Sequence, residues 1–291
     1  MKVGFLSVAT AQSGDLASLA KRAETLGFDS LWIPEHPVIP RGELTPYPFG
    51  GSLPEHYGRW LDPFVALTVC ATVTTTLKLA TGICLLPERE PLVTAKAIAS
   101  LDLVSRGRVL LGIGAGWLKE ETALMGVTFA KRWQRMREMA EALRVLWTED
   151  SPRYEGQQIR FPAVRSEPKP FRKGGPPFLL GGHGEKGLMR IAKHYDGWCP
   201  IANDPAAFAA EVKTLREMTQ AAGRDPDRLE ISPFVDPQHG ALSTAALRAY
   251  RDAGCARIVV FPHDATQELA DGKAEEWLAR TANLVERAKA L

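Results

Sequence analysis

Short apolar segments alternate with amphipathic segments along the whole chain, and this alternation restricts the fold more than any other feature. Strands that are separated by helices pair in parallel. Eight segments have the composition of strands: residues 3–8, 30–33, 77–85, 109–112, 178–180, 197–200, 229–234 and 258–261. Eight such strands in 291 residues predict an α/β fold, a (β/α)8 TIM barrel that forms a single domain over residues 1–291.

The segments between the strands carry helix signals. Asp62 directly precedes Pro63 and an apolar run, and this order is typical of the start of a helix. Within residues 136–147 and 208–222, apolar side chains recur every three or four positions. Each of these segments is therefore predicted to form a helix that packs one face on the barrel wall.

Two segments interrupt the alternation. The first covers residues 36–61, an insertion of about residues 37–61 that is rich in proline, glycine and aromatic residues. A compact domain seldom carries so long a loop without a functional use. The second covers residues 151–176, and its residues 154–161 predict a small hairpin. We expect both insertions at the C-terminal face of the barrel, where they would shape its mouth.

Composition excludes several classes of protein. The formal net charge is +2 and the basic residues are scattered, so the chain shows no nucleic-acid footprint. Its densest basic cluster, Lys131, Arg132, Arg135 and Arg137, is interpreted as the solvated face of a helix. No apolar run approaches the roughly 20 residues that span a membrane, and the N-terminal residues resemble a strand more than a signal peptide. We therefore expect a cytoplasmic protein without a membrane or nucleic-acid partner.

The cysteines point neither to a disulfide framework nor to a metal site. All four, at positions 70, 84, 199 and 255, lie far apart and form no C-x-x-C pair. They are interpreted as small buried hydrophobic residues, and no metal ligand is assigned.

Glycine-rich turns follow three of the predicted strands. Gly112, Gly114 and Gly116 remove side chains where a flat or anionic ligand could approach the backbone, although their spacing is not a dinucleotide fingerprint. Gly82 and Ile83 suggest a bulge at the end of the third strand. A bare tight turn remains an alternative at the first of these places.

Another glycine-rich turn opens a helix. Residues 181–184 (GGHG) precede an amphipathic segment, so free N–H groups and the positive end of the helix dipole would face a ligand there. A phosphate is the anion that such a turn favours. Together the turns outline a pocket for a flat ring with a phosphorylated tail, which fits a flavin.

An acid and a histidine follow the second strand. Active sites of (β/α)8 barrels lie at the C-terminal ends of the strands, so Glu35 and His36 are expected at the mouth. A histidine there can move a proton near neutral pH. The alternative is a histidine that only caps the loop.

Four motifs in order make the chain similar to a known family. They are residues 27–36 (GFDSLWIPEH), 80–87 (ATGICLLP), 106–117 (RGRVLLGIGAGW) and 196–198 (DGW). With them the chain resembles the bacterial luciferase-like superfamily, in particular its branch of F420-dependent oxidoreductases. The resemblance covers essentially the whole chain and implies a TIM barrel that binds F420 or FMN at the strand ends.

The resemblance also implies roles for individual residues. His36 matches the catalytic histidine at the mouth, and the bond between Gly82 and Ile83 matches a non-prolyl cis peptide that supports the ring. The implied cofactor-binding residues are Thr81, Gly82, Ile83, Gly114, Ala115, Gly116, Gly181, Gly182, His183 and Gly184, and the implied substrate-pocket residues are Glu35, Tyr57, Trp60 and Trp117.

Two departures from the family pattern qualify these roles. Glu35 stands where the family often has aspartate, and Trp117 stands where its sugar-phosphate dehydrogenases carry a glutamate. An indole cannot donate the proton that this glutamate supplies, so oxidation of glucose 6-phosphate is disfavoured.

These inferences leave four functions open. The first is F420-dependent hydride transfer to or from a small organic substrate, and the second is an FMN-dependent monooxygenase that uses oxygen. The third is a non-catalytic flavin-binding protein. The fourth is a metal-dependent TIM-barrel hydrolase with His36, His183, His263 and Asp264 as candidate ligands. A homodimer is implied by the resemblance alone.

Overall fold

A parallel sheet forms the centre of the molecule. The computed structural model describes residues 1–237 and 242–291, and in this part of the chain nine strands form the main sheet in the order β10-β11-β1-β2-β3-β4-β7-β8-β9. Each pair of neighbouring strands in it is parallel. Its strands are β1 (Lys2–Leu6), β2 (Ser30–Ile33), β3 (Lys78–Leu85), β4 (Val109–Gly114), β7 (Phe178–Leu180), β8 (Gly197–Trp198), β9 (Glu230–Ile231), β10 (Phe234–Val235) and β11 (Arg257–Val260).

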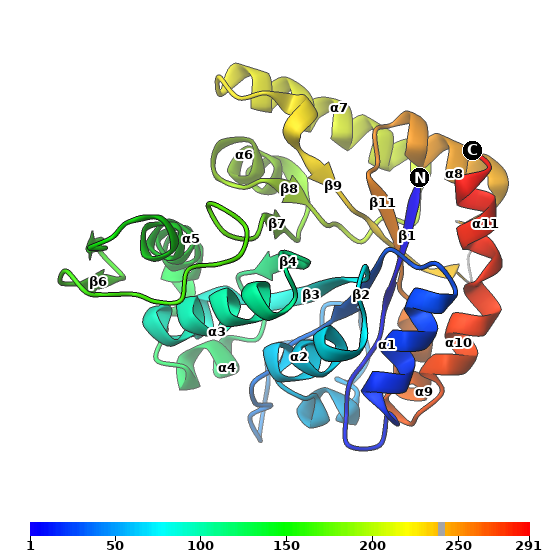
Figure 1. Cartoon of the computed structure of the whole chain (residues 1–291), viewed down its shortest axis with the longest axis horizontal. Coiled ribbons are helices and arrows are strands. Elements are labelled where there is room, and N and C mark those ends of the chain that lie inside the picture. Colours follow the sequence, from blue (N-terminus) through cyan, green and yellow to red (C-terminus); the bar gives the residue numbers. More distant parts are fainter. Residues whose placement is uncertain (238–241) are drawn as a thin grey trace.

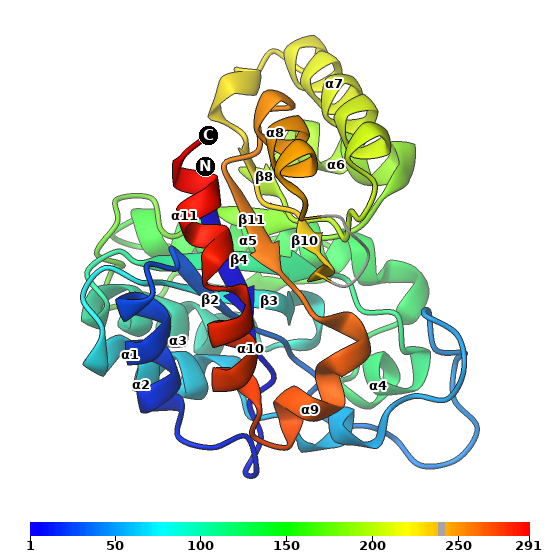
Figure 2. The same cartoon turned by 90° about the vertical axis from the view of Figure 1, so that its right-hand side faces the viewer.

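Helices cover the outside of this sheet (Figure 1). They are α1 (Leu16–Thr25), α2 (Pro63–Val73), α3 (Pro91–Val104), α4 (Lys119–Leu124), α5 (Arg132–Thr148), α6 (Gly184–His194), α7 (Pro205–Ala221), α8 (Thr244–Asp252), α9 (Thr266–Ala270), α10 (Ala274–Thr281) and α11 (Asn283–Lys289). The two termini lie side by side in both views (Figures 1 and 2), and the Met1 amino group donates to the Ala288 carbonyl at 3.0 Å. None of the described helices is both long enough and apolar enough to cross a membrane.

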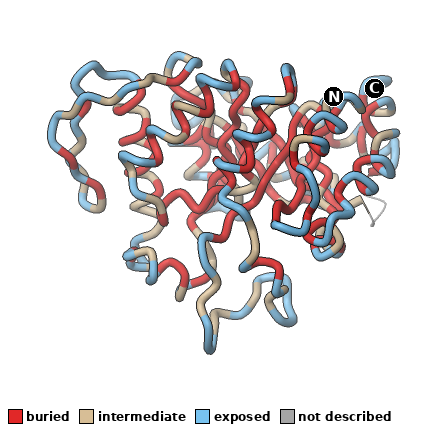
Figure 3. The backbone as a smooth tube through the Cα atoms, turned by 60° about the horizontal axis from the view of Figure 1, so that its bottom comes forward, coloured by how far each residue is buried: buried red, intermediate tan, exposed pale blue. Residues whose placement is uncertain are grey.

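The sheet is curled, as shown by side chains from strands all around it that meet in one interior cluster. This cluster contains Leu6, Trp32, Ala80, Leu110, Leu179, Cys199, Phe234 and Val259. A larger apolar layer fills the space between the sheet and the helices. Figure 3 shows the result, with buried backbone in the interior and exposed backbone at the periphery.

The predicted strand at residues 229–234 is two strands in the structure. Its first part, β9, pairs with β8, and its second part, β10, pairs with β11. Pro233 lies between the two parts and has no N–H to donate, so a continuous ladder through this position is not available. The Phe234 N–H instead donates to the Pro200 carbonyl at 2.7 Å, beyond the end of β8. The other seven predicted strands are confirmed within about two residues at each end.

The predicted start of α2 and the predicted buried face of α7 are confirmed. One Asp62 carboxylate oxygen accepts from the Phe64 and Val65 N–H groups, at 2.8 and 3.1 Å, and caps α2. Phe208, Val212 and Leu215 form the buried stripe of α7. All four cysteines are free and buried, as the sequence predicted.

The two inserted segments differ in their relation to the strand ends. The first lies between α4 and α9 (Figure 2): the Thr45 N–H donates to Glu120 at 3.0 Å, and His56 contacts the Thr266 hydroxyl at 3.1 Å. The second contains the predicted hairpin, as β5 (Tyr154–Glu155) and β6 (Arg160–Phe161).

The expectation that the hairpin shapes the mouth is wrong. It follows a helix rather than a strand, and it packs along α5, where the Gln158 N–H donates to Glu138 at 2.7 Å. None of residues 151–176 lines the pocket described below.

A buried arginine joins α2 to the start of β4. The Arg108 guanidinium donates to the carbonyls of Ala71, Thr74 and Leu77 and to the Thr74 hydroxyl, at 2.8–3.0 Å. These acceptors lie at the end of α2 and in the turn that follows it, so Arg108 fixes the position of β4 beside β3.

Replacing Arg108 by methionine will therefore destabilise the fold. Several buried acceptors would lose their donor together, and we expect the free energy of unfolding to fall by about 3 kcal/mol. Urea denaturation will measure this change. The exposed Arg228→Met variant is the control, and equal stability of the two variants would contradict the role of Arg108.

Candidate functional site

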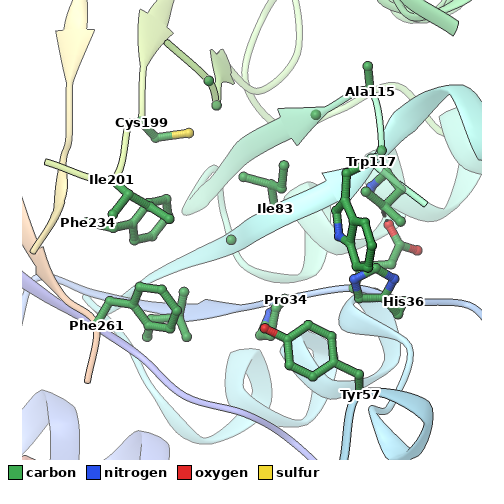
Figure 4. A pocket seen from close by; sticks show the side chains of 18 of the residues that line it. Pro34, His36, Tyr57, Ile83, Ala115, Trp117, Cys199, Ile201, Phe234 and Phe261 are labelled. Atoms are coloured by element: carbon green, nitrogen blue, oxygen red, sulfur yellow. Dashed lines mark hydrogen bonds between the residues drawn. The ribbon is translucent and has the colours of Figure 1, made fainter. Parts of the chain in front are cut away.

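A pocket of about 340 Å³ opens at the C-terminal ends of the strands (Figure 4). This volume is within the usual range for small-molecule sites. It is lined by residues that follow the strands, by the first inserted segment and by α5: Leu6, Val8, Pro34, Glu35, His36, Phe49, Tyr57, Trp60, Gly82, Ile83, Leu85, Gly114, Ala115, Gly116, Trp117, Trp133, Gly181, Gly182, His183, Cys199, Ile201, Phe234, Phe261 and Thr266.

Most of the predicted site residues meet in this pocket. Two do not: Thr81 and Gly184 are absent from its lining. The Thr81 side chain is fully buried, and its hydroxyl donates to the Gly112 carbonyl at 2.7 Å, inside the sheet. Thr81 therefore supports the strand pair β3–β4 and does not face a ligand.

The end of β3 is irregular, as predicted. The register between β3 and β4 shifts between Thr81 and Cys84, and the peptide bond between Gly82 and Ile83 is cis. The Ile83 side chain lies on the pocket side of this bulge (Figure 4).

Glycines around Ile83 make room for the protein's own side chains. A Cβ atom on Gly114 would lie 2.0 Å from the Ile83 Cδ1 atom, and one on Gly112 would lie 2.2 Å from the Thr81 carbonyl oxygen. A Cβ atom on Gly116 would lie 2.7 Å from a Glu88 carboxyl oxygen. These glycines therefore make room for Ile83 and Glu88, and the prediction that they also leave the backbone open to a ligand stays a prediction. Ile83 then forms the pocket wall.

The turn after β7 provides uncapped N–H groups. His183 is the N-cap of α6, but its side chain makes no capping hydrogen bond, so within the described residues no side-chain acceptor caps the first N–H groups of the helix. Gly182 has φ +115°, and a Cβ atom there would meet nothing within 4 Å. The Trp198 indole donates to the Gly182 carbonyl at 2.8 Å and fixes the turn. An anion is the ligand that such a helix end favours.

His36 is held by a carboxylate that the sequence analysis missed. Its Nδ1 atom lies 2.7 Å from the Glu121 Oε2 atom, and both side chains are buried. The other Glu121 oxygen accepts from the Val38 N–H at 3.4 Å. Glu121 lies on α4, 85 residues from His36 along the chain, and no spacing rule connects two such positions.

An aromatic cluster surrounds His36. The rings of Tyr57 and Trp60 each lie 5.3 Å from the imidazole, and the ring of Trp117 lies 6.0 Å from it. The Tyr57 hydroxyl is hydrogen-bonded to the Tyr47 hydroxyl at 2.7 Å. Burial and this hydrogen bond raise the pKa of Tyr57, so it stays neutral. The first inserted segment thus covers His36 with an apolar wall.

Glu35 lines the pocket, but protein groups engage its carboxylate. It pairs with the Arg89 guanidinium and accepts from the Leu85 N–H at 2.7 Å. Arg89 also pairs with Asp62 at 2.6 Å. Glu35 therefore forms part of the pocket wall, and its charge is balanced by Arg89 rather than by a substrate.

A second carboxyl lies close to the site and was also missed. Glu88 is buried, and its Oε1 atom accepts from the Thr122 hydroxyl at 2.8 Å. Its Oε2 atom has no hydrogen-bond partner within the described residues. Burial, with repulsion from the nearby Glu121 as a smaller cause, raises the pKa of Glu88 from 4.5 to about 8. Glu88 therefore holds a proton at neutral pH.

This proton makes stability depend on pH. Above pH 4.5 the unfolded chain releases the proton while the folded chain retains it, so stabilisation is complete below pH 4.5 and is lost as the pH rises through about 8. Between pH 5 and pH 8 the free energy of unfolding of the wild type should fall by about 3.5 kcal/mol more than that of the Glu88→Gln variant, which lacks this proton. Urea denaturation at both values tests this, and an unchanged pH dependence would contradict it.

The histidines named as metal ligands have other partners. His183 lies 3.5 Å from Glu211, and His263 lies 3.2 Å from Asp264. Over residues 1–237 and 242–291, no group of three or more His, Cys, Asp or Glu side chains is arranged to hold a metal ion. The donor set for a metal-dependent hydrolase is therefore not assembled there.

The basic cluster at the start of α5 is only partly a solvated face. Arg132 donates to the Gly116 carbonyl at 3.1 Å, and Arg135 donates to the Pro87 carbonyl at 2.7 Å. Both arginines thus brace the glycine turn and the segment after β3. The prediction of a solvated face is wrong for these two residues, because both donate to backbone carbonyls of other segments. The sequence did not reveal these contacts, because the acceptors come from distant parts of the chain.

Four further pocket residues come from strand ends that the sequence analysis did not examine. They are Cys199, Ile201, Phe234 and Phe261 (Figure 4). Each lies in or shortly after a predicted strand, so the position rule for barrel strands could have found them. Trp133, on α5, carried no such signal.

Several known proteins have sequences similar to this chain. An uncharacterised protein of Mycobacterium tuberculosis is 39% identical over 228 residues, which cover 76% of this chain and 80% of that protein. The 5,10-methylenetetrahydromethanopterin reductase of Archaeoglobus fulgidus is 28% identical over 281 residues, which cover 94% of this chain and 77% of the reductase.

A solved structure has the same fold. The coenzyme F420 dependent tetrahydromethanopterin reductase of Methanopyrus kandleri superposes with a TM-score of 0.69 at 19% identity, over 95% of this chain and 98% of that one. The sequence profile of luciferase-like monooxygenases matches residues 4–289. The chain therefore belongs to the luciferase-like monooxygenase family.

Proposed function

We propose that the protein is an F420-dependent oxidoreductase that transfers hydride to or from a small, uncharged, largely apolar organic substrate. The observation that carries the proposal is the layout of the pocket. An uncapped helix end lies on one side, the flat wall at Ile83 and Gly114 lies in the middle, and the His36–Glu121 pair lies on the other side. The 28% identical reductase from Archaeoglobus fulgidus supports the same class of reaction.

The residues present fit a ring with an anionic tail. Ile83, Gly114 and Ala115 offer an apolar surface against which one ring face can pack. The N–H groups after Gly182 can hold a phosphate, and the Arg132 and Arg190 side chains near Trp133 add positive charge on that side. We propose Gly82, Gly116, Gly181 and His183 as further cofactor contacts.

When bound, F420 would supply a carbon that exchanges hydride with the substrate. The protein binds and orients both reactants and keeps water out. His36 holds the proton that accompanies the hydride, and Glu121 fixes the imidazole through its Nδ1 atom, so that Nε2 is the nitrogen left for the substrate. Trp117, Tyr57 and Trp60 would form the apolar part of the substrate pocket.

The charge of the pocket supports an uncharged substrate. The lining, within the described residues, includes neither lysine nor arginine, and its carboxylate, Glu35, is paired with Arg89 outside it. A substrate phosphate or carboxylate would find no counter-ion there beyond His36 and His183. Secondary alcohols, carbonyl compounds and enones are therefore the classes to test.

An FMN-dependent monooxygenase is the second candidate. It is favoured by the family description itself, and the uncapped helix end would accept the phosphate of FMN equally well. A flavin-binding protein without turnover is a third, weaker candidate.

We also propose that the curled sheet closes as a (β/α)8 barrel of one domain. Support comes from the bridge between Ile201 and Phe234, which joins the segment after β8 to β10. The insertion at residues 37–61 would then lie at the C-terminal face. A homodimer and a cytoplasmic location stay predictions.

Turnover assays separate the candidates. The purified protein would be incubated with F420 and a panel of secondary alcohols, or with reduced F420 and a panel of enones and carbonyl compounds, under exclusion of oxygen. A change in the F420 absorbance that depends on substrate supports the proposal. Oxygen consumption with reduced FMN, and no reaction with F420, would replace it with the monooxygenase.

A further inference from the structure

A second cavity of about 290 Å³ lies beside the pocket, and His36 lies between the two. It is lined by Glu35, His36, Pro37, Trp60, Leu61, Asp62, Pro63, Glu88, Arg89 and Met125. Glu35, His36 and Trp60 line both cavities. We call this second cavity the side chamber. Its wall carries the ionisable side chains of Glu35, His36, Asp62, Glu88 and Arg89, so it can hold ordered water.

Two buried acids line the side chamber: Glu35, which is paired with Arg89, and Glu88. About 7% of the surface of Glu88 is exposed, its Oε1 atom is bonded to Thr122, and its Oε2 atom is unpartnered within the described residues. An unpartnered buried oxygen is costly when ionised and is tolerated better in a neutral carboxyl. Its proton would then be available to a neighbouring base.

The charged groups near Glu88 come from several elements. Glu121 lies on α4, Glu35 and His36 follow β2, Asp62 caps α2, Arg89 is the next residue, and Arg135 on α5 donates to the Pro87 and Arg89 carbonyls. Within the described residues, the guanidinium in the chamber wall, that of Arg89, is already paired with Glu35 and Asp62. Glu88 therefore faces carboxylates without a cation of its own, which agrees with its raised pKa of about 8.

A filled pocket would leave His36 with few routes to water. Its Nδ1 atom is bonded to Glu121, and aromatic rings of Tyr57, Trp60 and Trp117 surround the imidazole. A bound ring and substrate would cover the pocket side. The side chamber is a second cavity that reaches His36.

We propose that the side chamber is the proton port of the site and that Glu88 exchanges protons with His36 across it. In substrate reduction, as the product leaves, the O–H bond of the Glu88 carboxyl breaks, a proton passes through chamber water, and an N–H bond forms again on the His36 Nε2 atom, which has given its proton to the substrate, while Nδ1 stays bonded to Glu121. Glu88 becomes a carboxylate and takes a new proton from bulk water. Substrate oxidation runs the same transfers in reverse.

The first test needs no cofactor and so does not depend on the proposed function. Infrared spectroscopy of protein with isotope-labelled glutamate will show a carboxylic acid band that disappears as the pH rises through about 8 and that is absent in Glu88→Gln. The ring resonances of His36 in histidine-labelled protein will change at the same pH in the wild type, and this change will be lost in Glu88→Gln. His36 resonances that do not change when Glu88 ionises would overturn the proposal.

The second test uses turnover. In the wild type the rate of substrate reduction will fall above about pH 8, where Glu88 loses its proton, and Glu88→Gln will be about tenfold slower at pH 7 and lack this fall. The exposed Glu149→Gln variant is the matched control and will behave as wild type. If Glu88→Gln has the same rate and pH profile as the control, Glu88 has only a structural role and the proposal is overturned. Absence of turnover in the wild type would instead refute the proposed function and leave the decision to the His36 resonances.

Discussion

Replacing His36 by glutamine will lower turnover by about 10²–10⁴-fold and leave cofactor affinity within about twofold. Glutamine keeps a polar side chain of similar reach, but it cannot take up and release a proton near neutral pH. His36 follows β2, whereas the helix end that we assign to the phosphate follows β7, three strands further along the sheet, so the loss should fall on the chemical step. Single-turnover kinetics with reduced F420, together with a fluorescence titration of the cofactor, will separate the two quantities.

Two variants control this prediction. His194→Gln makes the same substitution on α6, away from the pocket lining, and should leave turnover unchanged. Glu121→Gln keeps the shape of the His36 partner but removes its charge, and should cost about 10–100-fold. Turnover of His36→Gln within about threefold of wild type would mean that another group moves the proton.

Replacing Gly182 by aspartate will weaken binding of a phosphate-bearing cofactor by at least about 100-fold. The new carboxylate would stand beside the uncapped end of α6 and would repel the phosphate of the cofactor. It would also accept hydrogen bonds from the free N–H groups that the phosphate would otherwise use. The φ of +115° adds backbone strain that side chains rarely accept. Titration with F420, FMN and phosphate-free riboflavin will measure the effect, which should be much smaller for riboflavin.

Gly223→Asp is the matched control for strain. Gly223 also has a positive φ, of +73°, and a Cβ atom there also meets nothing within 4 Å, but it lies after α7 and outside the pocket lining. This variant should bind cofactor as wild type does. Equal losses for riboflavin and for the phosphate-bearing cofactors in Gly182→Asp would move the phosphate away from the α6 turn.

The positions of the strands along the chain were predictable because each strand carries its own local signal. β-Branched and apolar residues mark the strands, and Asp62 with Pro63 marks a helix start, so these elements need no knowledge of distant residues. The split at Pro233 was visible in principle, because proline interrupts a ladder.

The partners of the site residues were not predictable from local pattern. Glu121 reaches His36 and Glu88 approaches Gly116 only because distant segments meet in the fold. The close contacts of Gly114 and Gly116 were not predictable either, because their neighbours Ile83 and Glu88 come from β3 and the segment after it. The hairpin at residues 154–161 was recognised, but its position outside α5 depends on packing rather than on its own sequence.

Paired titrations of the purified protein with F420 and with FMN, followed by ring fluorescence, test the central claim most directly. The account predicts saturable F420 binding that is at least about tenfold tighter than FMN binding and that is weakened in Gly182→Asp. Tight FMN binding with no F420 binding would contradict hydride transfer to F420 and favour the monooxygenase. Binding of neither cofactor would contradict the assignment of the pocket itself.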